Sequence, residues 1–311
     1  MNLMKIPGVD KEISQVILGT MMYSPDAYQH STKMLDTFFE EGGNALDTAH
    51  IYGGGNSEKL IGQWMQERKN RNDVFLIDKG GHPYGGIPNR VAPEYVKQDL
   101  DVNLTRLNTD YIDLYMLHRD DTSIQVSTII DYLNEEINAG RIRWIAASNW
   151  EPARIDEANR YALENGLHGF VACSNNISLA VPMEPIWGGC VIVDEEARQW
   201  HKETQFPLMP WSSQARGFFS GAFTPENRHD SNMVRVYYND ENFERFERAK
   251  KFGSKYGFSA IQVSLAYCLH LPFPIFPIIG PANLEELHSS LEALNLKLSN
   301  EEMAWLNLES D

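Results

Sequence analysis

Cysteine is scarce in this sequence: its 311 residues include 3, namely Cys173, Cys190 and Cys268. They form no CxxC pair, and no histidine stands at zinc-ligand spacing from them, so no metal site is expected. Three cysteines also make a poor disulfide framework, which favours a reducing, cytoplasmic environment.

Positive charge is scarce as well, because 27 lysines and arginines face 43 aspartates and glutamates and leave a formal net charge of −16. Proteins that bind nucleic acids or anionic membrane surfaces need a basic footprint, so both partners are excluded. No apolar run approaches the roughly 18 residues of a membrane span, and residues 1–8 lack the apolar centre of a signal peptide. We therefore expect a cytoplasmic protein that acts on a small molecule.

Strand-like apolar runs that alternate with helical segments are abundant. The strands are expected at residues 15–20, 43–47, 74–79, 111–118, 142–148, 169–174, 207–211 and 273–279. The helices are expected at residues 27–41, 57–69, 93–107, 127–139, 152–165, 195–204, 259–270 and 284–294. Eight strand–helix units predict an α/β fold of the (β/α)8 TIM-barrel type, built as a single domain of residues 1–311.

Two segments, residues 180–194 and 222–239, have no clean hydrophobic period and follow late strands. In such a barrel they are extended loops at the C-terminal face, where the active sites of these barrels lie. Long loops in that place usually cover a substrate or a cofactor. An ordinary surface insertion is the alternative.

Four polar residues stand at or just after the ends of three consecutive strands: Asp47, Tyr52, Lys79 and His118. Taken singly, the tyrosine could be a packed aromatic residue and the histidine a structural one. Together they suit proton transfer to a carbonyl oxygen, because a lysine ammonium lowers the pKa of a neighbouring phenol from its usual ~10 toward the range of a general acid–base group. Asp47 would keep the lysine charged, and His118 would direct the carbonyl or relay a proton.

The same residues belong to longer motifs. These are Asp47-Thr48-Ala49, Tyr52-Gly53, Ser57-Glu58, Lys79, Asp113-Leu114-Tyr115 with His118, Gly140-Arg141-Ile142-Arg143 and Ser148-Asn149. In these motifs, and nearly end to end, the chain resembles the aldo-keto reductases. The resemblance implies a barrel enzyme that transfers hydride reversibly between a nicotinamide cofactor and an aldehyde or ketone. It also implies that Tyr52 is the proton donor and that Asp47, Lys79 and His118 support it.

Cofactor contacts are implied by the same resemblance. Ser148 and Asn149 would meet the nicotinamide carboxamide, Ser174 replaces the family's usual glutamine, and Trp211 would stack on the nicotinamide ring. The loop after Trp211 would wrap the pyrophosphate. The implied cofactor contacts are Gly19, Thr20, Met21, Asp47, Ser148, Asn149, Ser174, Trp211, Ser212, Ser213, Gln214, Arg216, Gly217, Gly280, Pro281, Ala282, Asn283 and Glu286.

The choice of cofactor depends on residues 280–287. Many family members that use NADPH place a lysine or arginine here, whereas this stretch has no cation and Glu286 stands where an arginine is common. A carboxylate accepts hydrogen bonds from ribose hydroxyls in other NAD sites. The sequence therefore favours NAD(H), with NADP(H) possible if Arg228 or Arg235 reaches the phosphate. Acidic residues that simply favour the first turn of a helix are the ordinary alternative.

The residues expected to contact substrate are Met21, Tyr23, Tyr84, Arg119 and Trp187. The charged residues that follow His118 suit a sugar-like aldehyde or ketone, or they merely lie at the solvated end of a strand. Two other functions stay open: a Schiff-base lyase with Lys79 as nucleophile, and a cofactor-binding regulatory subunit on the same barrel. The sequence does not distinguish a monomer from a homo-oligomer.

Overall fold

A computed structural model describes residues 1–310 of the chain, which divides into two compact units. The first unit is Met1–Ser174, and the second begins at Asn175. The expectation of a single domain over residues 1–311 stays a prediction.

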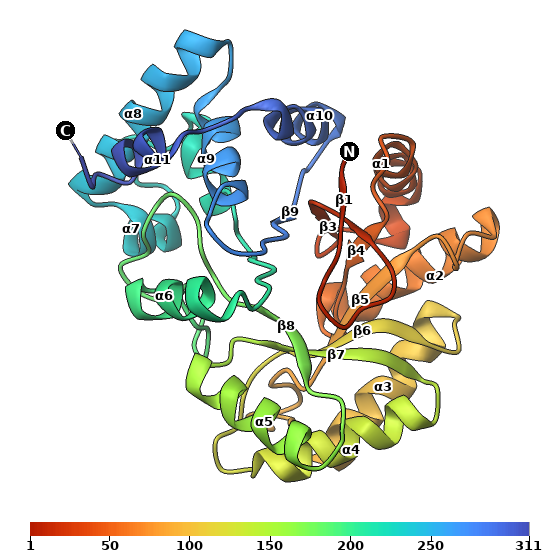
Figure 1. Ribbon diagram of the computed structural model, residues 1–311. Helices are drawn as coiled ribbons and strands as arrows, with labels where there is room; N and C mark the ends of the chain where they lie inside the picture. The colour runs from red at the N-terminus through yellow and green to blue at the C-terminus, as the bar shows by residue number, and fades with distance from the viewer. Residues whose placement is uncertain (311) are drawn as a thin grey trace. The chain divides into compact units, whose positions relative to one another are not determined.

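The first unit contains a sheet of parallel strands (Figure 1). Within this unit the strands lie in the order β8, β7, β6, β5, β4, β3, so strands that follow one another in the sequence are neighbours in the sheet. Their bounds are β3 Ile17–Gly19, β4 Ala45–Asp47, β5 Phe75–Gly80, β6 Ile112–Leu117, β7 Ile142–Ser148 and β8 Phe170–Ser174. All six overlap strands predicted from the sequence.

A helix connects each strand of this sheet to the next, as a parallel order requires. The helices are α1 Tyr28–Glu40, α2 Asn56–Arg68, α3 Pro93–Leu107, α4 Val126–Asn138 and α5 Pro152–Glu164. Proline occupies the first helical position of α3 and α5, where its fixed φ suits a helix start and no hydrogen-bond donor is lost.

Central strands of this sheet are buried along their whole length. Every residue of β5 and β6 is buried, which is typical of a parallel strand covered on both faces. Two buried acidic residues interrupt these apolar runs. Asp113 in β6 pairs with Arg71 at 2.8 Å, and Asp78 in β5 accepts a hydrogen bond from Lys79 N at 2.8 Å.

The register of the parallel strands brings their carboxyl ends to one edge of the sheet. Gly19 lies beside Asp47, Gly80 beside Leu117, and Ser148 beside Ser174. Side chains at or just beyond these positions therefore gather at that edge. The sequence did not predict the small hairpin of β1 Leu3–Met4 and β2 Ile13–Ser14 that precedes the sheet.

The second unit is mainly helical. Its elements are α6 Glu195–Thr204, α7 Ser231–Tyr237, α8 Asp240–Tyr256, α9 Ala260–Leu269, β9 Ile278–Ile279, α10 Leu284–Glu292 and α11 Asn300–Leu306. Helices α8 and α11 were not predicted, and α7 lies within the segment 222–239 that was expected to be a loop.

Proline explains why the last two predicted strands are so short. Residues 207–211 form only an isolated bridge, Leu208 to Ile275, and residues 273–279 reduce to β9. Pro207 and Pro210 flank that bridge on one side, and Pro274 and Pro277 flank it on the other. A proline has no N–H to donate to a strand ladder, so regular pairing cannot extend.

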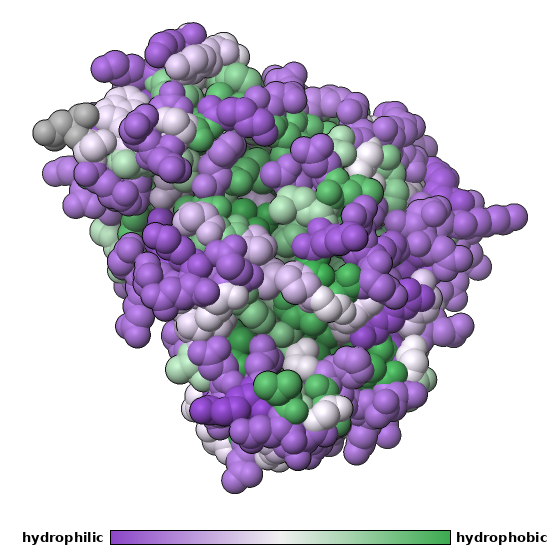
Figure 2. Space-filling model, in the orientation of Figure 1, coloured by the Kyte–Doolittle hydropathy of each residue, from purple (hydrophilic) through white to green (hydrophobic). Residues whose placement is uncertain are grey.

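No helix within residues 1–310 is both long enough and apolar enough to cross a membrane. Hydrophilic residues are the most frequent on the face of the molecule that Figure 2 shows.

Candidate active site

The buried ion pair of Lys79 and Asp47 lies at the carboxyl edge of the first unit's sheet. Lys79 Nζ lies 2.5 Å from Asp47 Oδ1 and donates a second hydrogen bond to the carbonyl of Thr48 at 2.9 Å. The exposed fractions of Asp47 and Lys79 are 3% and 2%. Burial alone would lower the pKa of Lys79, but Asp47 and Tyr52 beside it outweigh burial and raise that pKa above its ordinary value. The lysine is therefore an ammonium at neutral pH.

Tyr52 reaches this ion pair through its hydroxyl group. Lys79 Nζ donates a hydrogen bond of 3.4 Å to Tyr52 Oη. Burial raises the pKa of Tyr52, and Lys79 opposes this rise without cancelling it. The expectation that Lys79 lowers this pKa below its ordinary value is wrong for this structure, because burial disfavours the phenolate more strongly. Tyr52 is thus a phenol that keeps its proton through neutral pH and can donate it.

Glycines allow Tyr52 to sit where it does. The short helix η2, Tyr52–Gly55, contains three residues with positive φ, and Gly55 has the largest value, 90°. A Cβ on Gly55 would come within 2.3 Å of the Arg106 guanidinium. That guanidinium hydrogen-bonds the carbonyl of His50 and the carboxylate of Glu58, so it holds the segment that carries Tyr52.

His118 completes the group of four predicted residues. Its ring lies edge to face with the ring of Tyr52, with 5.8 Å between the ring centroids. Burial lowers the pKa of His118 well below its ordinary value, and the nearby Lys79, His82 and Arg119 lower it further. His118 is therefore neutral near pH 7, and its Nδ1 has no hydrogen-bond partner among residues 1–310.

A second histidine, which the sequence analysis missed, lies next to His118. The ring centroids of His82 and His118 are 4.9 Å apart. The signal available in the sequence was position alone, because His82 follows the strand-end Lys79 by three residues.

A buried polar cluster supports the backbone on either side of Lys79. Asn103 accepts a hydrogen bond from His50 Nδ1 at 2.7 Å and donates to the carbonyl of Lys79 at 3.5 Å. Asp99 accepts hydrogen bonds from Gly81 N at 2.9 Å and from Arg90 at 2.6 Å. These side chains fix the ends of β4 and β5, and with them the segments that carry Tyr52 and Lys79.

The residues predicted to meet the nicotinamide from the first unit are close together. Ser148 Oγ donates to the carbonyl of Ser174 at 3.0 Å, and Asn149 Nδ2 donates to Ser148 Oγ at 3.1 Å and to the carbonyl of His118 at 3.2 Å. The hydroxyl of Ser174 is buried and has no hydrogen-bond partner in the described part of the chain. An unpaired buried hydroxyl in this place fits the amide group of a nicotinamide.

Three further residues of the first unit, Gly19, Thr20 and Met21, were predicted to contact the cofactor. The hydroxyl of Thr20 is buried and bonds Asp47 O and Ser57 Oγ, so it ties strand ends together. Gly19 pairs in register with Asp47, and Met21 is 44% exposed. For all three, a cofactor contact stays a prediction.

The second unit holds the residues predicted to contact the ring and pyrophosphate of the cofactor. Trp211 packs against Trp187 with 5.7 Å between centroids, and the guanidinium of Arg216 lies 5.4 Å from the Trp187 ring. The indole N–H of Trp211 is buried without a hydrogen-bond partner among the described residues. Ser213 Oγ donates a hydrogen bond of 2.9 Å to the carbonyl of Ile278.

The loop that follows Trp211 is a run of left-handed backbone. Four of its residues have φ between 47° and 84°: Ser212, Ala215, Arg216 and Gly217. The N–H groups of Ala215 and Gly217 close turns within the loop, donating to the carbonyls of Ser212 at 2.8 Å and Gln214 at 3.0 Å. Arg216 is exposed and is the cation of this loop, so its contact with the diphosphate of a dinucleotide stays a prediction, as does that of Gln214.

The predicted substrate contacts differ in exposure. Tyr84 is 56% exposed and Trp187 is 43% exposed, whereas Tyr23 is 4% exposed. Arg119 is buried and donates a hydrogen bond of 2.8 Å to the carbonyl of His118. Their role in substrate binding stays a prediction.

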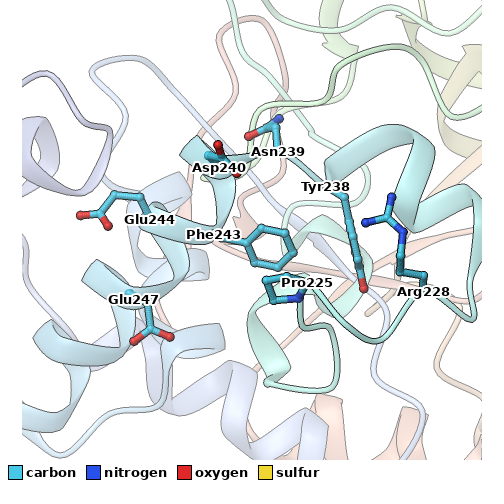
Figure 3. Close-up of a pocket in the computed structure, with 8 residues that line it drawn as sticks. All are labelled: Pro225, Arg228, Tyr238, Asn239, Asp240, Phe243, Glu244 and Glu247. Carbon is cyan, nitrogen blue, oxygen red and sulfur yellow. The ribbon is translucent and has the colours of Figure 1, made fainter.

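The two alternative cations named for the cofactor phosphate have other partners. Arg235 bonds Glu184 and the carbonyl of Ile186, and so ties α7 to the preceding segment. Arg228 lines a separate cavity of about 380 Å³, and Figure 3 shows it beside the Tyr238 ring, with the carboxylates of Glu244 and Glu247 on the opposite side of that cavity. An acidic lining does not suit a phosphate group.

Three comparisons show what the chain is similar to. The model of the Aldo/keto reductase family matches residues 15–307. Norsolorinic acid reductase of Aspergillus flavus is 30% identical over 310 residues, which cover 94% of this chain and 76% of that protein. The aryl-alcohol dehydrogenase (NADP(+)) of Phanerodontia chrysosporium is 27% identical over 97% of this chain and 83% of that protein. The crystal structure of the thermostable aldo-keto reductase Tm1743 with the inhibitor epalrestat matches with a TM-score of 0.77, at 22% identity and over 100% of both chains.

The expectation of NAD(H) as the favoured cofactor is wrong. The relative named as an NADP(+) aryl-alcohol dehydrogenase points to NADP(H) instead. The structure also removes the reason given for NAD(H), because the carboxylate of Glu286 is occupied. It accepts hydrogen bonds from Ala282 N at 2.8 Å and Asn283 Nδ2 at 3.2 Å, and Asn283 in turn caps Glu286 N. Glu286 lies in the first turn of α10, so the alternative, that the acidic residues here simply favour a helix start, accounts for it.

The predicted (β/α)8 barrel fold is confirmed by its structural neighbour. Reductase and dehydrogenase names among the relatives agree with the predicted oxidoreductase activity. With the family model spanning nearly its whole length, the chain is an oxidoreductase that belongs to the aldo/keto reductase family.

Proposed function

We propose that this protein uses NADPH to reduce an aryl aldehyde or ketone to an alcohol, with Tyr52 as the proton donor. The observation that carries the proposal is the hydrogen-bonded series Asp47–Lys79–Tyr52 at the carboxyl edge of the sheet. Tyr52 is protonated at neutral pH, as reduction of a carbonyl requires of its acid.

Each member of the series has one task. The bound cofactor supplies the hydride. Tyr52 gives its proton to the developing alkoxide, and the ammonium of Lys79 stabilises the phenolate that remains. Asp47 keeps that ammonium charged, and neutral His118 donates a hydrogen bond to the carbonyl oxygen.

Each unit carries residues that we propose as cofactor contacts. Ser148, Asn149 and Ser174 would bind the carboxamide, and Trp211 would stack on the nicotinamide. The left-handed loop with Arg216 would bind the diphosphate, and residues 280–283 would lie along the adenosine part.

An aryl substrate is favoured over a sugar. Two relatives carry names that refer to aryl alcohols or to norsolorinic acid, and the rings of Tyr52, His82 and His118 surround the proposed reaction site. The charged residues that suggested a sugar are engaged locally: Asp120 pairs with Arg154 at 3.4 Å, and Asp121 accepts hydrogen bonds from Ser123. The sugar-like substrate therefore loses its main support.

The two other functions are less well supported. A Schiff-base lyase needs an unprotonated lysine, whereas Asp47 and Tyr52 hold Lys79 as an ammonium. A purely regulatory subunit would have no use for the complete series of Asp47, Lys79 and Tyr52.

The test follows NADPH absorbance with purified protein, an aryl aldehyde and, separately, a short-chain aldose. We expect turnover of the aryl aldehyde, and Tyr52→Phe should lower kcat about 100- to 10,000-fold while NADPH binding, followed by fluorescence, persists. Tyr161→Phe on α5 is the matched control. Full turnover by the Tyr52→Phe protein would refute the role of Tyr52, and a preference for the aldose would refute the substrate class.

A further inference from the structure

His82 occupies a position set by two glycines that end β5. A Cβ on Gly80 would lie 2.0 Å from Tyr115 Oη, and Gly81 has a φ of +77°. Gly81 N is held by Asp99 at 2.9 Å. The chain therefore turns sharply after Lys79 and brings the His82 ring back beside His118.

Hydrogen bonding defines which nitrogen of His82 can act. His82 Nδ1 lies 2.9 Å from the carbonyl of Pro83. A carbonyl only accepts, so Nδ1 carries the proton and Nε2 carries a lone pair in the neutral ring. Burial lowers the pKa of His82, with Arg119 nearby adding to the effect, so the neutral form persists near pH 7. Nε2 has no hydrogen-bond partner within residues 1–310.

The ring that carries this acceptor lies close to the proposed reaction site. The His82 ring is 4.9 Å from the ring of His118, which is 5.8 Å from the ring of Tyr52. A substrate whose carbonyl oxygen is bound by Tyr52 and His118 thus extends its nearby substituents past His82. His82 retains partial exposure, so such a substituent can reach it.

We infer that His82 is a specificity-determining residue, which accepts a hydrogen bond through Nε2 from a hydroxyl group that the aryl carbonyl substrate carries close to its reducible carbon. The inference rests on the proposed function and adds a substrate class to it, namely hydroxylated aryl aldehydes or ketones. A methoxy group in place of the hydroxyl cannot donate, and the acceptor nitrogen is then left without a partner.

The experiment measures kcat/KM with NADPH for the three isomeric hydroxybenzaldehydes and the three matching methoxybenzaldehydes. The natural protein should favour at least one hydroxy compound over its methoxy partner by about threefold to tenfold. His82→Phe, which keeps an aromatic ring at this position, should abolish that preference, and each variant's kcat/KM with unsubstituted benzaldehyde serves as its own reference. His82→Gln, whose side-chain oxygen can accept a hydrogen bond, should restore part of the preference.

His168→Phe is the matched control, because His168 is exposed and precedes β8 at the opposite edge of the sheet. A preference that survives in His82→Phe, or that is absent from the natural protein, would overturn the inference and leave the proposed function standing. Absence of turnover with every aldehyde would overturn both. If His82→Phe fails to fold, His82→Ala takes its place in the same comparison.

Discussion

Asp78 and Glu58 are neighbouring buried carboxyl groups inside the first unit, and burial raises the pKa of both. Both residues have an exposed fraction of 0%, and one oxygen of each has no hydrogen-bond partner among the described residues. The second oxygen of Glu58 accepts a hydrogen bond from Arg106 at 2.7 Å, and the second oxygen of Asp78 accepts one from Lys79 N at 2.8 Å. Burial, followed by the charge of Glu58, raises the pKa of Asp78 well above its ordinary value, so we expect Asp78 to be the protonated member of the pair.

Asparagine should therefore replace Asp78 almost without loss, because its side chain is neutral, as a protonated Asp78 is. We expect Asp78→Asn to change the free energy of unfolding by less than about 1 kcal/mol. Glu58→Gln removes the charge that pairs with Arg106 and should destabilise by about 3 kcal/mol or more. Urea unfolding at pH 7 measures both variants, and equal losses would contradict a proton held by Asp78.

Lys79 and Asp47 should stabilise the fold only as a pair. Lys79→Met leaves a buried carboxylate without a cation and should lower the free energy of unfolding by about 3–5 kcal/mol. The double variant Asp47→Asn with Lys79→Met removes both charges and should recover much of that loss. Urea unfolding of the two single variants and the double variant gives the coupling energy directly. A double variant no more stable than Lys79→Met would contradict this prediction.

Acid should weaken the fold through His118. The pKa of His118 is depressed in the folded state by burial and by nearby Lys79, so below about pH 6.5 the unfolded chain binds a proton that the folded chain does not. Stability should fall with decreasing pH in that range, by up to about 1.4 kcal/mol per pH unit for this residue. His118→Gln should make the decline between pH 6.5 and pH 5 shallower, as these reference values imply.

Urea unfolding at several pH values measures how much His118 contributes to the pH dependence of stability, with His168→Gln as the control. His82 and His201 also have lowered pKa values, chiefly through burial, so a smaller slope should remain in His118→Gln. An unchanged slope would show that His118 is protonated equally in the folded and unfolded states.

Arg216 should matter for NADPH affinity and Arg228 should not. The guanidinium of Arg216 is exposed on the left-handed loop after Trp211, whereas Arg228 lines the acidic cavity of α8. A charge-assisted hydrogen bond contributes about 1.5–3 kcal/mol, so Arg216→Gln should weaken NADPH binding roughly 10- to 100-fold. Fluorescence titration of both variants measures this, and a larger loss in Arg228→Gln would place the anion site elsewhere.

Local sequence patterns were enough to predict the sheet of the first unit and the residues at its edge. Continuous apolar runs such as 112–117 define buried parallel strands, and polar residues that follow them must gather at one edge. The approach of Asp47, Tyr52, Lys79 and His118 follows from that topology. The roles of these residues in catalysis remain a prediction.

Side-chain direction and proton position were not predictable in the same way. Glu286 could bond a ribose or its own helix start, and only the placement of Ala282 and Asn283 decides between them. His82 was missed because the turn through Gly80 and Gly81 determines where its ring lies. The pKa of Tyr52 depends on burial, which motif spacing does not reveal.

The close approach of Gly80 to Tyr115 limits how this site can be re-engineered. Any β-carbon at position 80 would meet Tyr115 Oη at 2.0 Å, and it would also meet the side chain of Asp99 at 3.1 Å. Directed-evolution libraries can vary His82 and Tyr84 to alter substrate preference, but we expect substitutions at position 80 to give inactive variants. Position 80 should therefore be kept as glycine in any such library.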